Sequence, residues 1–194
     1  MKNLQFKQLL LLSDTQKKAN QFLFQKRFNL ITADDNSVGK STLAKLLLWT
    51  FGCEPDFDST WKSTDCKCLV DFSIDGTNYK ILRYQNFISL KEENKEILNY
   101  TNIGGDYSKK FAELVDFKVL LPKRGSDETE LVTPPPAYYF LPFYMDQKNS
   151  WSKTWNSFGK LGQFDNWQKT VIKFTFCCWF GIYFFSRRIR SADD

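Results

Sequence analysis

The chain has 194 residues and a mass of 22.8 kDa, with 27 basic and 22 acidic side chains and no histidine. This length suits one domain or one lobe of a larger domain. A composition of 42% apolar and 25% charged residues excludes a disordered or fibrous chain. The absence of histidine excludes Ser-His and Cys-His catalytic pairs and mixed Cys/His zinc sites.

The net charge of +5 is mild, and the basic residues occur in short, scattered groups. This pattern permits weak contact with nucleic acid or anionic lipid without requiring it. The five cysteines are odd in number and form no paired C-x-x-C motif, which indicates neither a secreted disulfide framework nor a zinc ribbon. Residues 1–14 hold a brief leucine run without a small-residue cleavage site, so they make a poor signal peptide. We therefore expect reduced thiols and a cytoplasmic protein.

Apolar periodicity and turn residues predict the following elements in chain order. The first part contains strands at 3–12 and 21–25, a short strand at 28–32 buried on both faces, and a helix at 41–51. Gly52 is placed to end that helix in the left-handed conformation. Asp75-Gly76 predicts a tight hairpin between strands at 68–74 and 77–84, because both central residues of a type I′ turn need positive φ. Further along we expect a hairpin of 87–90 with 97–100, helices at 107–117 and 163–174, and an exposed connector at 122–136.

The segment Asp34–Thr42 is the motif that carries chemistry. It matches the phosphate-binding pattern G-x-x-x-x-G-K-[ST] except at the first position, where Asp34 replaces glycine. In such a loop successive backbone N–H groups point inward to bind an anion, and Gly39 lets the backbone approach the phosphates. We expect Lys40 to reach the β- and γ-phosphates and the Ser41 hydroxyl to bind Mg²⁺, while the following helix directs its N-terminal dipole at the same phosphates. The predicted nucleotide-binding residues are Asp34, Asn36, Ser37, Val38, Gly39, Lys40, Ser41 and Thr42.

The departure of Asp34 from the phosphate-binding pattern affects the expected nucleotide affinity. Aspartate adopts the left-handed conformation more readily than most residues other than glycine, but its carboxylate would lie near a polyphosphate. We expect nucleotide binding to be weakened, unless the Asp34 carboxylate turns toward solvent.

The segment Phe28–Leu48 resembles the N-terminal half of an ABC-type ATPase head. The most similar type is the SMC, RecF and RecN group, whose loops read G-x-N-G-x-G-K-S/T and which includes bacterial proteins of DNA repair and anti-phage defence. The matching positions are Asn36, Gly39, Lys40 and Ser41, and the departures are Asp34 and Ser37. The resemblance implies an α/β fold, a P-loop NTPase lobe of the ABC-head type with an antiparallel β-hairpin subdomain. The implied cofactors are ATP and Mg²⁺.

Residues 138–147 resemble the strand that leads into the Q-loop of such heads. In that family the loop glutamine contacts Mg²⁺ and the attacking water, so the resemblance implies that Gln147 joins Ser41 as a metal ligand. Residues 151–173 are similar to the segment beyond the Q-loop, and the resemblance as a whole covers residues 1–173.

Three family elements are missing from the sequence: an L-S-G-G-Q-like signature, an apolar run that ends in Asp-Glu, and a switch histidine. In the family these lie on the C-terminal half of the head, so the chain resembles an N-terminal fragment or a split subunit. No catalytic residue is assigned, and we expect Mg-ATP binding with little hydrolysis unless a C-terminal head half or a second ATPase head completes the site. DNA is a further candidate partner by resemblance. The alternative is a non-catalytic interaction subunit, whose degenerate P-loop docks on a complete ATPase or effector; a different P-loop NTPase such as a small kinase fits the two hairpins poorly.

Residues 174–185 form a twelve-residue apolar run followed by basic residues at 187, 188 and 190. A membrane span needs about 20 apolar residues, so we do not expect a membrane protein. A buried terminal element, a tail anchor and a tail foreign to the fold remain as interpretations, and the change in composition favours the third. The predicted division is therefore a lobe at 1–173 and a tail at 174–194.

Overall fold

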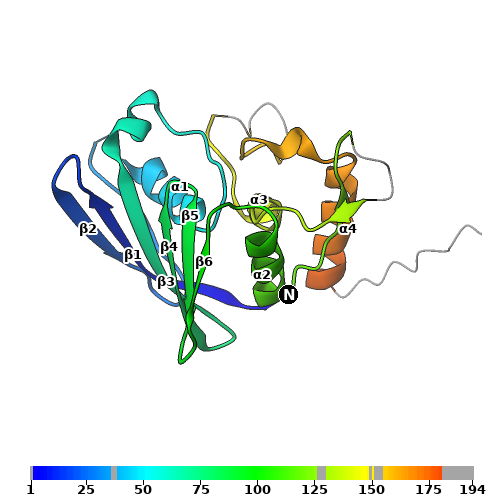
Figure 1. The fold of residues 1–194 in the computed structure, drawn as a ribbon. Coiled ribbons are helices and arrows are strands. Elements are labelled where there is room, and N and C mark those ends of the chain that lie inside the picture. Colours follow the sequence, from blue (N-terminus) through cyan, green and yellow to red (C-terminus); the bar gives the residue numbers. More distant parts are fainter. Residues whose placement is uncertain (1, 36–38, 126–129, 149, 151–154, 181–194) are drawn as a thin grey trace, which may run out of the picture.

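A computed structural model describes residues 2–35, 39–125, 130–148, 150 and 155–180. Its main element is a six-stranded antiparallel sheet in the order β2-β1-β3-β4-β5-β6 (Figure 1). The strands are β1 (Leu4–Ser13), β2 (Lys18–Leu23), β3 (Cys66–Ile74), β4 (Thr77–Tyr84), β5 (Phe87–Glu92) and β6 (Ile97–Tyr100). Strands from both sides of the first helix therefore share one sheet, because β1 pairs with both β2 and β3.

Both predicted hairpins are confirmed. Asp75 and Gly76 have φ values of 48° and 90°, as a type I′ turn requires, and Ile74 pairs with Thr77 across the turn. The second hairpin joins β5 to β6, and β5 extends two residues further than predicted.

The first helix packs against the sheet, and the other helices lie to one side of it (Figure 1). They are α1 (Lys40–Thr50), α2 (Asp106–Val115), α3 (Ala137–Phe140) and α4 (Trp167–Phe180). Short 3-10 turns occur at Ser59–Thr64, Leu141–Phe143 and Leu161–Gln163, and a small ribbon pairs β7 (Leu121–Pro122) with β8 (Leu131–Val132). The predicted helices at 41–51 and 107–117 are confirmed as α1 and α2, and α1 packs against β3 and β4.

The core is built around Phe51, which directly follows α1 and is fully buried. Its ring centre lies 5.6 Å from that of Phe6 on β1 and 4.9 Å from that of Phe72 on β3. On the other side it lies 6.1 Å from the ring of Phe111 on α2 and 5.7 Å from that of Phe140 on α3. Edge-on aromatic packing at these distances joins the sheet and three helices into one apolar core.

Three sequence predictions, for 28–32, 138–147 and 122–136, differ from the structure. The run at 28–32 forms no strand, and Phe28 and Leu30 are 91% and 88% exposed. Instead the Asn29 side chain bonds both backbone groups of Gln25, at 2.6 Å to its N–H and 3.0 Å to its carbonyl, which closes a local turn. An apolar run is buried only where a neighbouring element covers it, and no described strand pairs with this one.

The strand that the resemblance implied at 138–147 is not formed: its first part is helical, as α3 and the 3-10 turn after it. Pro136 precedes α3 with helical backbone angles, and proline fixes φ at a value that suits a helix start. The connector at 122–136 is also not exposed throughout, since Pro134 and Pro136 are buried.

Helix α4 starts four residues later than predicted and continues to Phe180, so the predicted division after residue 173 falls inside a helix. Phe174 packs edge-on against Phe117 with ring centres 5.2 Å apart. Residues 181–194, which include the basic part of the tail, lie outside the described residues.

Candidate functional site

The structure describes the phosphate-binding motif at residues 34–35 and from Gly39 onward, and the run at 28–32 before it forms no strand. Gly39 stands immediately before the helix with φ 94° and ψ 10°, a left-handed conformation that glycine adopts without strain. The first intrahelical bond runs from the Leu43 N–H to the Gly39 carbonyl at 2.9 Å. No side chain of the described residues caps the helix. The first N–H groups of a helix have no partner within the helix, and such an end favours an anion.

Lys40 lies over the beginning of the loop. Its ammonium donates a hydrogen bond of 2.7 Å to the carbonyl of Asp35. An ammonium has three donors, so this contact leaves two for a phosphate. Ser41 is exposed on the first turn of α1, where a hydroxyl can reach a metal that accompanies the phosphates.

The loop itself is only partly described. Asn36, Ser37 and Val38, three of the predicted nucleotide-binding residues, lie outside the described residues. Asp34 is exposed to solvent, as is its neighbour Asp35. Exposed carboxylates are screened by water and salt, so they oppose an anion less than buried ones would.

The segment that carries Gln147 contacts α1 through the residue that precedes the glutamine. Gln147 is exposed in a turn that follows the 3-10 helix rather than a strand. The preceding residue, Asp146, is buried and forms an ion pair of 3.3 Å with Lys45 on α1. Lys45 is four residues after Ser41, so the two lie on one face of the helix, one turn apart. The pair of Lys45 with Asp146 thus ties the segment that carries Gln147 to the helix that carries Ser41.

The other end of α1 is held by Arg83 on β4, whose side chain is buried. Its guanidinium donates to the carbonyls of Trp49, Cys53 and Gln85, and forms an ion pair of 2.6 Å with Glu54. A helix ends with unsatisfied carbonyl groups, and a cation at that end is favoured by the helix dipole. Arg83 therefore fixes α1 on the sheet. No motif in the sequence marks Arg83, although strand alternation with Tyr79 and Ile81 places it on the core side.

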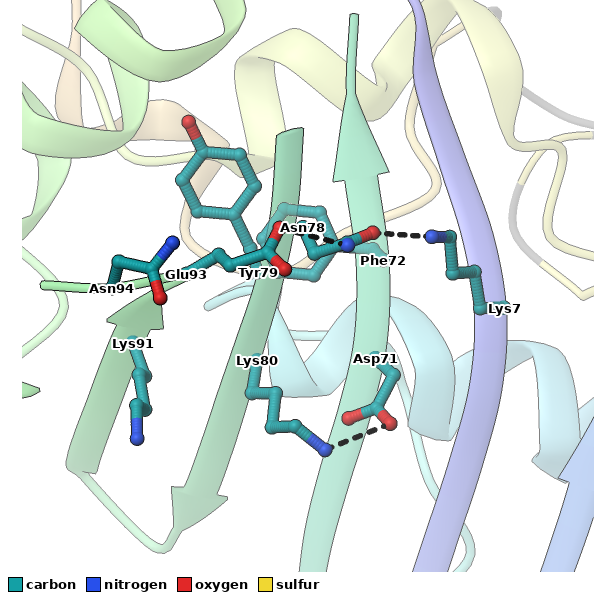
Figure 2. Close-up of a pocket in the computed structure, with 9 residues that line it drawn as sticks. All are labelled: Lys7, Asp71, Phe72, Asn78, Tyr79, Lys80, Lys91, Glu93 and Asn94. Atoms are coloured by element: carbon teal, nitrogen blue, oxygen red, sulfur yellow. Dashed lines mark hydrogen bonds and ion pairs between the residues drawn. The ribbon is translucent and has the colours of Figure 1, made fainter. Parts of the chain in front are cut away.

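A second polar hollow, of about 460 Å³, lies on the sheet (Figure 2). It is lined by residues of β1, β3, β4 and β5 and of the turn after β5, and includes none of the predicted nucleotide-binding residues. Lys7 pairs with Asn78, which in turn donates to Glu93 at 2.9 Å, and Lys80 pairs with Asp71 at 3.1 Å (Figure 2). Three lysines face two acidic residues here, and so balanced a charge gives little preference for a polyphosphate.

No protein-family model matches the chain. The chain is similar to Lamassu protein LmuB of Bacillus cereus, with 26% identity over 172 residues that cover 89% of this chain and 30% of that protein. It is also similar to Lamassu protein LmuB of another Bacillus strain, with 27% identity over 136 residues, which cover 70% of this chain and 23% of that protein. The chain thus spans less than a third of the length of the curated relatives it matches. Among the helices that the structure describes, none has the length and apolar character needed to cross a membrane.

Proposed function

We propose that this chain binds Mg-ATP at the start of α1, as the N-terminal part of an SMC/RecF-like ATPase head. The observation that carries the proposal is the left-handed Gly39 before an uncapped, 11-residue helix whose first residue is Lys40. A fixed positive dipole, the N–H groups of a helix start and an ammonium at one point suit a polyphosphate.

The described residues also fit a nucleotide-bound metal. Mg²⁺ prefers oxygen ligands and takes few of them from the protein when nucleotide phosphates supply others. The Ser41 hydroxyl and the Gln147 amide oxygen are two such ligands, and the buried pair of Asp146 with Lys45 holds their elements together. When bound, Mg²⁺ neutralises phosphate charge and would leave α1 to hold and orient the nucleotide.

In this proposal, ATP hydrolysis requires a C-terminal head half or a second ATPase head in addition to this chain. Phe28 and Leu30, just before the loop, expose apolar side chains that a C-terminal head half or a second head would cover. Phe143 and Met145, just before Gln147, are exposed as well. These apolar residues lie on both segments that lead into the site, which supports completion of the site by a partner surface.

We further propose a role in anti-phage defence. The bacterial proteins of the group that the loop resembles include defence proteins, and the similarity to Lamassu protein LmuB favours that process over DNA repair. The partners of this chain would be the C-terminal head half or second head named above, and DNA is a further candidate partner.

The second candidate is a non-catalytic interaction subunit that docks on a complete ATPase or effector. Asp34 favours it, because it replaces the first glycine of the phosphate-binding pattern and so leaves the P-loop degenerate.

Equilibrium titration with labelled ATP in excess MgCl₂ tests the proposal on the whole chain. Removing a charged hydrogen-bond partner weakens binding by about tenfold or more, so we expect that loss for Lys40→Ala. Lys91→Ala, which removes an exposed lysine of the sheet, is the matched control and should leave the affinity unchanged. No binding at millimolar ATP, or equal binding by native chain and Lys40→Ala, would favour the interaction subunit.

A further inference from the structure

The ion pair between Asp146 and Lys45 joins parts of the chain that are far apart in sequence. Its oxygen and nitrogen atoms are 3.3 Å apart, and the two side chains are 1% and 16% exposed. Burying two charges is costly unless further hydrogen bonds satisfy them, and such pairs contribute little net stability. A buried pair at this place therefore calls for a role in specifying geometry.

Hydrogen bonds of Asp146 shape the turn around Gln147. The Asp146 carboxylate accepts a hydrogen bond of 3.0 Å from the backbone N–H of Lys148, which closes an Asx turn with Gln147 at its centre. The Asp146 N–H donates to the Ser150 hydroxyl at 2.9 Å. One residue thus fixes the backbone on both sides of the exposed glutamine.

The same segment is tied to the chain that follows it. The Ser157 hydroxyl donates to the carbonyl of Tyr144 at 2.7 Å and lies 2.8 Å from the hydroxyl of Ser150. The Tyr144 hydroxyl donates to the Asp146 carboxylate at 3.3 Å, and burial raises the pKa of this tyrosine, with the Asp146 charge acting in the same direction. The turn is therefore held as one hydrogen-bonded unit.

Asp56, in the loop after α1, provides a second link between helix and turn. Lys45 donates to the Asp56 carbonyl at 2.6 Å, and Lys148 forms an ion pair of 3.0 Å with the Asp56 carboxylate. Lys45 thus contacts the turn directly and, through Asp56, also the residue that follows Gln147.

We propose that Asp146 and Lys45 are positioning residues that hold Gln147 at the metal side of the site, so that Mg²⁺ strengthens nucleotide binding only while this pair is intact. The inference rests on the proposed function, since it needs a nucleotide at the start of α1. It adds that the response to the metal is set by two residues that do not touch the nucleotide.

The test compares ATP affinity in excess MgCl₂ with ATP affinity in excess EDTA, using the whole chain. The ratio of the two affinities is the magnesium effect. Loss of a residue that orients a metal ligand weakens metal-dependent binding about 10-fold or more, so Asp146→Asn and Lys45→Met should each reduce the magnesium effect by about that factor, as Gln147→Ala should. Affinity in EDTA should not change, and Lys45→Arg, which keeps the charge, should retain most of the effect.

Two further variants sharpen the test. If Asp146 acts through Gln147, the double variant Asp146→Asn with Gln147→Ala should lose no more than either single variant. Asp165→Asn, which breaks the exposed 3.1 Å pair of Asp165 with Arg124, is the matched control and should behave as the native chain.

The outcomes separate the two proposals. A magnesium effect that survives in Asp146→Asn and Lys45→Met overturns this inference, and so does an equal loss of affinity with and without the metal, which indicates a structural role alone. A native chain that binds ATP with no magnesium effect also overturns it, while nucleotide binding stands. A native chain that binds no ATP overturns the proposed function, and this inference with it. If Asp146→Asn does not fold, Lys45→Met and Gln147→Ala decide the question.

Discussion

Arg83 donates a hydrogen bond to the carbonyl of Trp49, and its guanidinium carbon lies 4.3 Å from the centre of the Trp49 ring. One contact satisfies a carbonyl at the end of α1, and the other stacks a cation on the last turn of the same helix. Arg83 thus helps to hold the C-terminal end of α1 on the sheet, together with the buried face of the helix.

Arg83→Ala should lower the free energy of unfolding by about 3 kcal/mol, because it removes the buried guanidinium that bonds the Cys53 carbonyl and the Glu54 carboxylate. The Trp49 carbonyl keeps its bond from the Gly52 N–H. Chemical denaturation followed by tryptophan fluorescence measures this change. Arg124→Ala removes an exposed arginine with one ion pair and should change the free energy by less than about 0.5 kcal/mol. A loss below about 1 kcal/mol for Arg83→Ala would show that the contacts do not hold α1.

Alanine substitutions at Gly52 and Gly76 distinguish the cost of a strained backbone from the cost of steric crowding. Their φ values are nearly equal, at 94° and 90°, but an added Cβ at Gly52 would meet Ile103 at 3.0 Å and Tyr107 at 3.1 Å, whereas space is open at Gly76. Gly76→Ala should cost about 1–2 kcal/mol for the left-handed conformation alone. Gly52→Ala should cost at least about 1 kcal/mol more, because the core must shift. The free energy of unfolding is obtained from the denaturant midpoint and slope. If both variants lose the same free energy, the side chains around Gly52 accommodate the added methyl group without cost.

Burial makes the fold sensitive to alkali through its tyrosines. It raises the pKa of Tyr139 from an ordinary value of 10 to about 12. The neutral phenol is favoured in the folded state, so its contribution is fully present below pH 10 and is lost as the pH rises toward 12. From pH 9 to pH 11 this residue should remove about 1 kcal/mol of stability.

Denaturation at both pH values tests this, with Tyr139→Phe as the variant. Its stability should fall less between pH 9 and pH 11 than that of the native chain. The same fall in both proteins would contradict the assignment to Tyr139.

Asp34→Gly restores the glycine of the phosphate-binding pattern. Because the Asp34 side chain is exposed, solvent screens its carboxylate, and we expect ATP affinity to rise by less than about threefold at physiological salt. Titrations at two salt concentrations should show a larger gain at low salt. A gain of tenfold or more at physiological salt would place this carboxylate against the phosphates.

Local signals predicted the elements that depend on local chemistry. Asp75-Gly76 requires a tight turn and forms one, and Gly52 ends α1 in the left-handed conformation as predicted. The helices α1 and α2 were predicted for a similar reason, since their apolar residues recur with the helix period.

The errors concern segments whose structure depends on distant partners. The run at 28–32 is short and apolar, and periodicity cannot distinguish a buried strand from a helix turn at that length, while the strand at 138–147 was implied by the resemblance alone. The first segment is exposed because no described element covers it. The second is helical in its first part, and Pro136 favours a helix start there. The pair of Lys45 with Asp146 joins positions too far apart for any local pattern to indicate.

The central claim is that nucleotide binds at the start of α1 through Lys40. The most direct measurement is the melting temperature of the native chain and of Lys40→Ala, each with and without millimolar Mg-ATP. A ligand that binds only the folded state stabilises it by about 2.7 kcal/mol at 100 times its dissociation constant, so the native chain should melt several degrees higher with Mg-ATP. Lys40→Ala should show little or no rise. No rise in the native chain, or the same rise in both proteins, would contradict the account.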